Sequence, residues 1–67
     1  MSTVDKTMAN RIVAGEFAAD NPICIVKYQN CFNGEDAYGV IFEGQDLRKY
    51  HESAACRNPI IYWRRKK

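Results

Sequence analysis

Apolar positions in the first third of the chain recur at steps of three and four, which predicts an amphipathic N-terminal helix over residues 3–20. The apolar face of this helix would consist of Val4, Met8, Ala9, Ile12, Val13 and Phe17. Asp20-Asn21-Pro22 ends the pattern, because the residue before a proline avoids helical geometry. Gly15 lowers the helix propensity and Glu16 falls within the apolar arc, so an end near Gly15 is the alternative.

The middle of the chain predicts a β-hairpin. Residues 23–30 and 37–43 are rich in β-branched and aromatic residues, which is typical of strands. Asn33-Gly34 between them indicates a two-residue turn, and in that register Ile25 faces Phe42. Gly39 within the second strand marks a bulge or a close approach of another group.

Both faces of the predicted hairpin are apolar. One face carries Ile25, Tyr38, Val40 and Phe42, and the other carries Cys24, Val26, Tyr28 and Ile41. A single helix can cover only one of these faces. The second face therefore needs another cover, or it is available to a partner.

The last third of the chain predicts a short crossover and a final strand. Asp46 is a candidate cap for a short helix over residues 47–55, and residues 60–65 predict the strand. Strict alternation would place Tyr62 and Trp63 on opposite faces of that strand. The expected fold is one α+β domain, residues 1–67, in which the N-terminal helix packs on a three-stranded antiparallel sheet, with a short helical or irregular crossover before the last strand.

Composition excludes several classes of protein. The chain has 67 residues, 46% of them apolar, and a net charge of +2, which is typical of a small folded domain rather than a disordered one. A domain of this size has little material for a deep catalytic cleft, so we expect no enzyme. We expect no membrane association and a cytoplasmic location, because no apolar run is long enough to span a bilayer and no secretory pattern is present. Three cysteines, an odd number, fit a reducing compartment.

Cys24, Cys31, Cys56 and His51 are the candidate metal ligands. Together they would form a Cys₃His set, but their spacing matches no compact zinc motif. A zinc-stabilised domain is therefore a minor alternative, and we expect neither a metal nor a cofactor. The same residues contain no recognisable pairing of a nucleophile with a base.

The C-terminus combines aromatic and basic residues. Residues 1–63 carry six Lys and Arg against eight Asp and Glu, whereas Arg64, Arg65, Lys66 and Lys67 add four positive charges. These four residues are candidates for contact with nucleic acid or with an acidic surface. A solvated end that keeps the chain soluble is the plain alternative.

Four aromatic residues are candidates for partner binding: Tyr28, Phe32, Tyr62 and Trp63. We therefore expect a small non-catalytic regulatory protein that acts by protein–protein contact, and its size is typical of phage or mobile-element accessory proteins that inhibit host machinery. The expected partner is another protein, such as a host factor. Direct nucleic-acid binding through the aromatic and basic C-terminus is the alternative, and homo-oligomerisation stays open.

Overall fold

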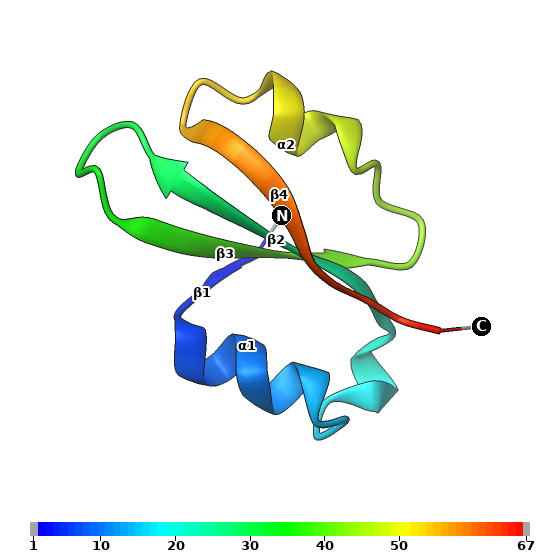
Figure 1. The fold of residues 1–67 in the computed structure, drawn as a ribbon. Helices are drawn as coiled ribbons and strands as arrows, with labels where there is room; N and C mark the ends of the chain where they lie inside the picture. The colour runs from blue at the N-terminus through cyan, green and yellow to red at the C-terminus, as the bar shows by residue number, and fades with distance from the viewer. Residues whose placement is uncertain (1, 67) are drawn as a thin grey trace.

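The computed structural model describes residues 2–66 and shows an α+β fold with one antiparallel sheet of four strands in the order β1-β3-β2-β4. The elements are β1 (Ser2–Val4), α1 (Lys6–Val13), the 3₁₀ turn η1 (Ala18–Asp20), β2 (Pro22–Asn30), β3 (Asp36–Phe42), α2 (Arg48–Glu52) and β4 (Cys56–Arg64). Helix α1 covers one face of the sheet and α2 the other (Figure 1). The predicted α+β class is confirmed, but the described part of the chain has four strands rather than three.

The chain begins with a strand, so the helix predicted over residues 3–20 is wrong at its start. Strand β1 pairs with β3, and its β-branched Thr3-Val4 pair favours the extended conformation. Asp5 caps α1, because its side chain accepts a hydrogen bond from the backbone N–H of Met8 at 2.8 Å. The short extra strand forms the edge of the sheet next to β3.

Helix α1 ends at Val13, close to the alternative end predicted at Gly15. Gly15 has φ +89°, a left-handed conformation that glycine adopts at little cost and that stops the helix. The Arg11 Nε donates to Glu16 at 2.8 Å across this turn, which keeps Glu16 out of the apolar face. The prediction that the helix continues to residue 20 is therefore wrong.

The β2–β3 hairpin has a longer loop than predicted. The Asn30 N–H donates to the Glu35 carbonyl at 2.9 Å, and the side chains of Asn30 and Asn33 accept from backbone N–H groups within the loop. These local hydrogen bonds compete with the two-residue turn that Asn33-Gly34 predicts. As a result Ile25 pairs with Val40 instead of Phe42. A shift of two residues leaves the side chains from Cys24 to Tyr28, and those paired with them on β3, on their predicted faces.

Both predicted apolar faces are confirmed as halves of the core. The α1-side cluster comprises Ala9, Ile12, Ile25, Tyr38 and Val40, with Phe42 packed against it. The α2-side cluster comprises Cys24, Val26, Tyr28, Ile41, Tyr50 and Cys56. The buried cluster on the second face is thus covered by α2, from within the chain.

Helix α2 covers this second face although it is shorter than the predicted 47–55. Its N-cap is Leu47, which makes no side-chain cap hydrogen bond, so the predicted cap Asp46 lies one residue too early. The Asp46 side chain still accepts from the Arg48 N–H at 2.9 Å. Tyr50 is the one buried residue of the helix and packs directly on Gly39, where any side chain would overlap the phenol ring. The close approach predicted at Gly39 is therefore confirmed, and Tyr50 is the group that approaches.

Two β-bulges interrupt the alternation of side chains, one in the pairing of β2 with β3 and one in the pairing of β4 with β2. Ile23 is inserted in β2, and Tyr62 is inserted in β4 between two consecutive pairs with β2. Ile23 consequently packs on the α2 side together with Cys24, and Tyr62 packs on the α1 side together with Trp63. The prediction that Tyr62 and Trp63 lie on opposite faces is wrong for this reason.

The buried phenol of Tyr50 predicts a loss of stability at high pH. Its hydroxyl donates to the Val40 carbonyl at 3.1 Å, and burial raises the pKa of Tyr50 to about 12 from its ordinary value of 10.0. Because the unfolded chain releases this proton more readily, the stabilisation is complete below pH 10 and is lost as the pH rises from 10 to 12. Denaturant titrations across this range should show the free energy of unfolding falling more steeply in the wild type than in Tyr50→Phe. Equal slopes would contradict the assignment to Tyr50.

Candidate protein-contact surface at strand β4

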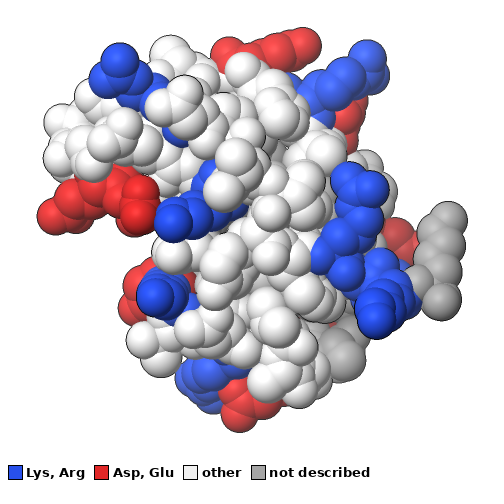
Figure 2. Space-filling model, viewed as in Figure 1, with Lys and Arg blue, Asp and Glu red and all other residues white. Residues whose placement is uncertain are grey.

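Strand β4 lies at an edge of the sheet and exposes two large apolar residues. It begins at Cys56, four residues earlier than the predicted strand 60–65, and it pairs with β2 along one side. Ile60 is 57% exposed and Ile61 45% exposed, although both lie within the strand. Figure 2 shows uncharged surface over β4, with Lys and Arg side chains gathered on the side where the chain ends.

The backbone of β4 is poorly suited to pairing with a further strand. The pairing with β2 shifts around Asn58-Pro59, where Asn58 has φ +53° and Pro59 has no N–H to donate. The bulge at Tyr62 is a second irregularity. Bulges and prolines on edge strands are features that prevent edge-to-edge association. Contact at β4 is therefore expected through side chains rather than through an added strand.

Basic residues flank the exposed isoleucines without acidic neighbours on the strand. Arg57 precedes them and Arg64-Arg65-Lys66 follows, with no Asp or Glu between Cys56 and Lys66. Within residues 2–66 the ion pairs are Arg11–Glu16, Lys27–Asp36 and Arg48–Asp46, so none of these four cations is engaged in one. The strand is thus a positively charged edge with an apolar centre.

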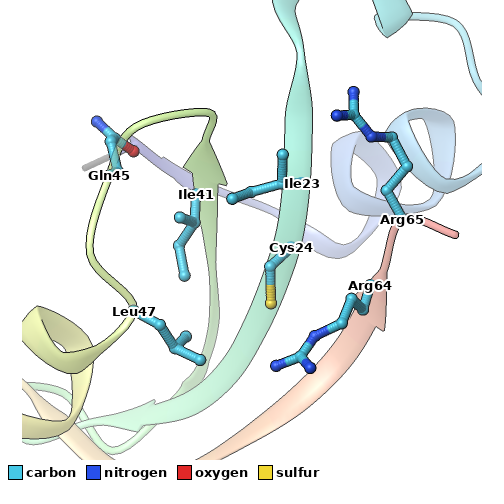
Figure 3. Close-up of a pocket in the computed structure, with 7 residues that line it drawn as sticks. All are labelled: Ile23, Cys24, Ile41, Gln45, Leu47, Arg64 and Arg65. Atoms are coloured by element: carbon cyan, nitrogen blue, oxygen red, sulfur yellow. The ribbon is translucent and has the colours of Figure 1, made fainter. Parts of the chain in front are cut away.

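A hollow on the α2 side of the sheet adjoins the end of β4. It encloses about 290 Å³, and we call it the Arg64 hollow after the arginine at its mouth. Its lining consists of Ile23, Cys24, Ile41, Gln45, Leu47, Arg64 and Arg65. Figure 3 shows the Arg64 guanidinium turned toward Cys24 and Leu47, whereas the Arg65 side chain extends away from the others. The lining contains no carboxylate and no imidazole.

Cys24 in the wall of the Arg64 hollow is a poor nucleophile. Burial raises the pKa of the Cys24 thiol, and the nearby Arg64 guanidinium offsets part of that rise. The thiol therefore stays protonated near neutral pH. The chemistry that the hollow offers is apolar contact with one positive charge at the mouth.

The structure does not bring the four predicted partner-binding aromatics together. Tyr28 is buried in the α2-side cluster, with its hydroxyl 3.3 Å from the Thr3 hydroxyl. Tyr62 and Trp63 are partly buried on the α1 side, where the Tyr62 hydroxyl donates to the Asn10 side chain at 2.6 Å. Phe32 alone is open, 83% exposed at the hairpin tip.

Tyr62 and Trp63 pack into the core instead of forming a binding surface. Tyr62 packs edge-on against Tyr38 with ring centroids 5.0 Å apart, and Trp63 lies opposite Ile25. These contacts fill the gap between β4 and α1. A single surface made of Tyr28, Phe32, Tyr62 and Trp63 is therefore excluded in this conformation.

The basic C-terminus is partly ordered as strand. Arg64 is the last residue of β4, and the Arg65 N–H donates to the Ile23 carbonyl at 2.9 Å, so the pairing with β2 continues past the strand. Lys66 follows as exposed chain, and Lys67 lies outside the described residues. The cations closest to the sheet are thus held in place relative to the Arg64 hollow.

No protein-family model, curated protein or solved structure matches this chain. Among residues 2–66, no three His, Cys, Asp or Glu side chains come close enough to hold a metal ion, and the three cysteines are free. None of the helices described here has the length and apolar character needed to cross a bilayer. Strand β4 and the Arg64 hollow are therefore the features of the molecule that bear on its function.

Sequence reasoning found the cations of this surface but missed Ile60, Ile61 and the Arg64 hollow. The exposed isoleucines look like core residues in the sequence, and their exposure follows from the position of β4 at the sheet edge. One feature of the sequence indicates this exposure: apolar residues between Asn58-Pro59 and a basic run are typical of an edge strand. The hollow depends on the Ile23 bulge, which no sequence pattern marks.

Proposed function

We propose that this chain is a small non-catalytic binding protein that contacts another protein through β4. The observation that carries the proposal is that Ile60 and Ile61 are both exposed on an edge strand, one on each face of the sheet, and that the charged residues flanking them along the strand are all positive. Exposed apolar residues with a charged rim are typical of protein–protein contact sites. The unpaired cations favour an acidic partner and would accelerate its association.

Protein contact is favoured over the alternative of direct nucleic-acid binding. A nucleic-acid surface built on Trp63 would need the indole face free for stacking on a base. Trp63 instead packs against the α1-side cluster, and the exposed apolar centre of β4 is aliphatic. Isoleucine offers no aromatic face to a base but contributes well to a dehydrated contact between proteins.

The test is capture of a partner from host lysate by the immobilised protein, with and without nuclease. Ile60→Asp and Ile61→Asp are the site variants, and Val13→Asp is the matched control, because Val13 is 41% exposed and lies on α1. We expect the wild type and Val13→Asp to capture the same protein in both conditions. At least one β4 variant should lower the captured amount about tenfold, the effect of losing roughly 1.4 kcal/mol of binding free energy.

Two results would contradict the proposal. Capture that disappears with nuclease would establish the nucleic-acid alternative. Capture that survives both isoleucine variants unchanged would exclude β4, and a parallel loss in Phe32→Ala would then place the contact at the hairpin tip. Inhibition of a host factor, expected from the size of the chain, stays a prediction until the captured protein can be assayed.

A further inference from the structure

Ile61 lies on the same face of the sheet as Arg64 and the Arg64 hollow. Ile61 lies opposite Val26 and Arg64 opposite Cys24, and both partners on β2 belong to the α2-side cluster. The Tyr62 bulge makes this arrangement, because it brings Ile61 and Arg64 to the same face although three positions separate them. A partner that covers Ile61 therefore also meets the mouth of the hollow.

The lining of the hollow favours an apolar side chain as its occupant. A volume of about 290 Å³ is at the lower end for a small-molecule site, which typically encloses about 300–1,000 Å³. The walls formed by Ile23, Ile41 and Leu47 are apolar, and the Arg64 guanidinium at the mouth has no ion-pair partner among the described residues. Apolar walls beneath a free guanidinium match an apolar side chain that has a carboxylate next to it.

A second copy of the chain is a poor occupant. Antiparallel pairing of two β4 strands about a point between Ile60 and Ile61 would place Arg57 opposite Arg64 of the second copy. Like charges directly across a strand pair are destabilising, and β4 has no acidic residue to offset them. The irregular backbone at Asn58-Pro59 opposes the same arrangement.

We propose that the partner presents an acidic segment whose apolar side chain enters the Arg64 hollow while an adjacent carboxylate pairs with Arg64. This assignment rests on the proposed role of β4 in protein contact and names the chemistry of the partner. Arg65 and Lys66 then stand at the rim, where they attract acidic residues that flank the anchor.

The test is titration of the ¹⁵N-labelled protein with a blocked peptide in which each leucine is flanked by pairs of glutamates. We expect shifts concentrated at the amides of Cys24, Ile41, Leu47 and Arg64. Arg64→Glu should weaken binding about tenfold or more, and Arg64→Gln should weaken it to a smaller extent. Lys6→Glu is the control, because it changes the net charge of the protein by the same amount at a position on α1, away from the hollow.

Control peptides and a second polyanion separate the possible sources of binding. Peptides with glutamine in place of glutamate, or alanine in place of leucine, should each bind at least about threefold more weakly. Equal binding of either peptide, or equal effects of Arg64→Glu and Lys6→Glu, would overturn the proposal. Binding of oligothymidylate with the same dependence on Arg64 would also overturn the proposal, because the site would then recognise negative charge alone.

The outcome is distinguishable from failure of the proposed function. Suppose that Ile61→Asp abolishes capture from lysate while Arg64→Glu leaves peptide binding unchanged. Strand β4 is then the contact surface, and the proposal of an acidic segment with an apolar anchor is wrong. If the peptide occupies the Arg64 hollow while both isoleucine variants still capture the partner, the hollow binds acidic segments and β4 is not the surface for that partner.

Discussion

Replacing Gly39 with alanine is expected to lower the free energy of unfolding by about 3 kcal/mol or more, or to prevent folding. A Cβ atom at this position would overlap the Tyr50 ring, lying 2.7 Å from its Cζ. Either β3 or the ring must move, and displacing a buried aromatic ring costs about as much as deleting it, roughly 3–5 kcal/mol. At roughly 0.05–0.15 kcal/mol per residue, a chain of this size has only about 3–10 kcal/mol of total stability. Denaturant titration followed by circular dichroism measures the loss.

Two variants isolate the cause of the Gly39 effect. Gly34→Ala meets no atom within 4 Å but has φ +73°, so it should cost only about 1–2 kcal/mol of backbone strain. In a Tyr50→Ala background, Gly39→Ala should cost less than about 1 kcal/mol, since the ring is no longer there to be displaced. A full cost in that background would show that the strand itself requires glycine and that contact with Tyr50 is not the reason.

Truncating Tyr50 to alanine should release α2 from the sheet. The helix has five residues, too few to be stable alone, and Tyr50 is its single buried residue. Losing the ring should cost about 3–5 kcal/mol, whereas Tyr50→Phe, which removes only the hydrogen bond to the Val40 carbonyl, should cost about 1 kcal/mol. Hydrogen exchange should therefore accelerate first at the amides of residues 48–56.

The contrast between the two helices is the control for this variant. Helix α1 packs on the opposite face through Ala9 and Ile12, so its amides should keep their relative protection as long as the sheet remains folded. Uniform loss of protection in α1 and α2 would contradict a local role for Tyr50 and would indicate that the chain unfolds as one unit.

The sequence pattern correctly assigns the core residues of β2 and β3 to the two faces of the sheet. The period-two pattern assigned Ile25 and Val26 to opposite faces, and this assignment survived an incorrect turn because the register moved by two residues. It also indicated that Gly39 meets another group closely. Only the fold shows that this group is Tyr50.

Features that depend on single inserted residues escaped prediction. Strict alternation cannot anticipate the bulges at Ile23 and Tyr62, and the Tyr62 bulge decides that both C-terminal aromatics join the core. The sequence pattern predicts helix where strand β1 forms, because Val4 and Met8 continue the apolar period of α1. Exposure of Ile60 and Ile61 depends on strand order, a tertiary property that local sequence patterns do not encode.

The order of the strands decides how the protein should be attached to a support. Strand β1 occupies one edge of the sheet and β4 the other, so a linker joined before Ser2 leaves from the edge that does not carry the exposed isoleucines. An affinity tag joined after Arg64-Arg65-Lys66 would instead lie next to the basic side chains whose binding is being measured. Binding measured through a C-terminal tag would then underestimate the affinity, and the same partner measured through an N-terminal linker would show it in full.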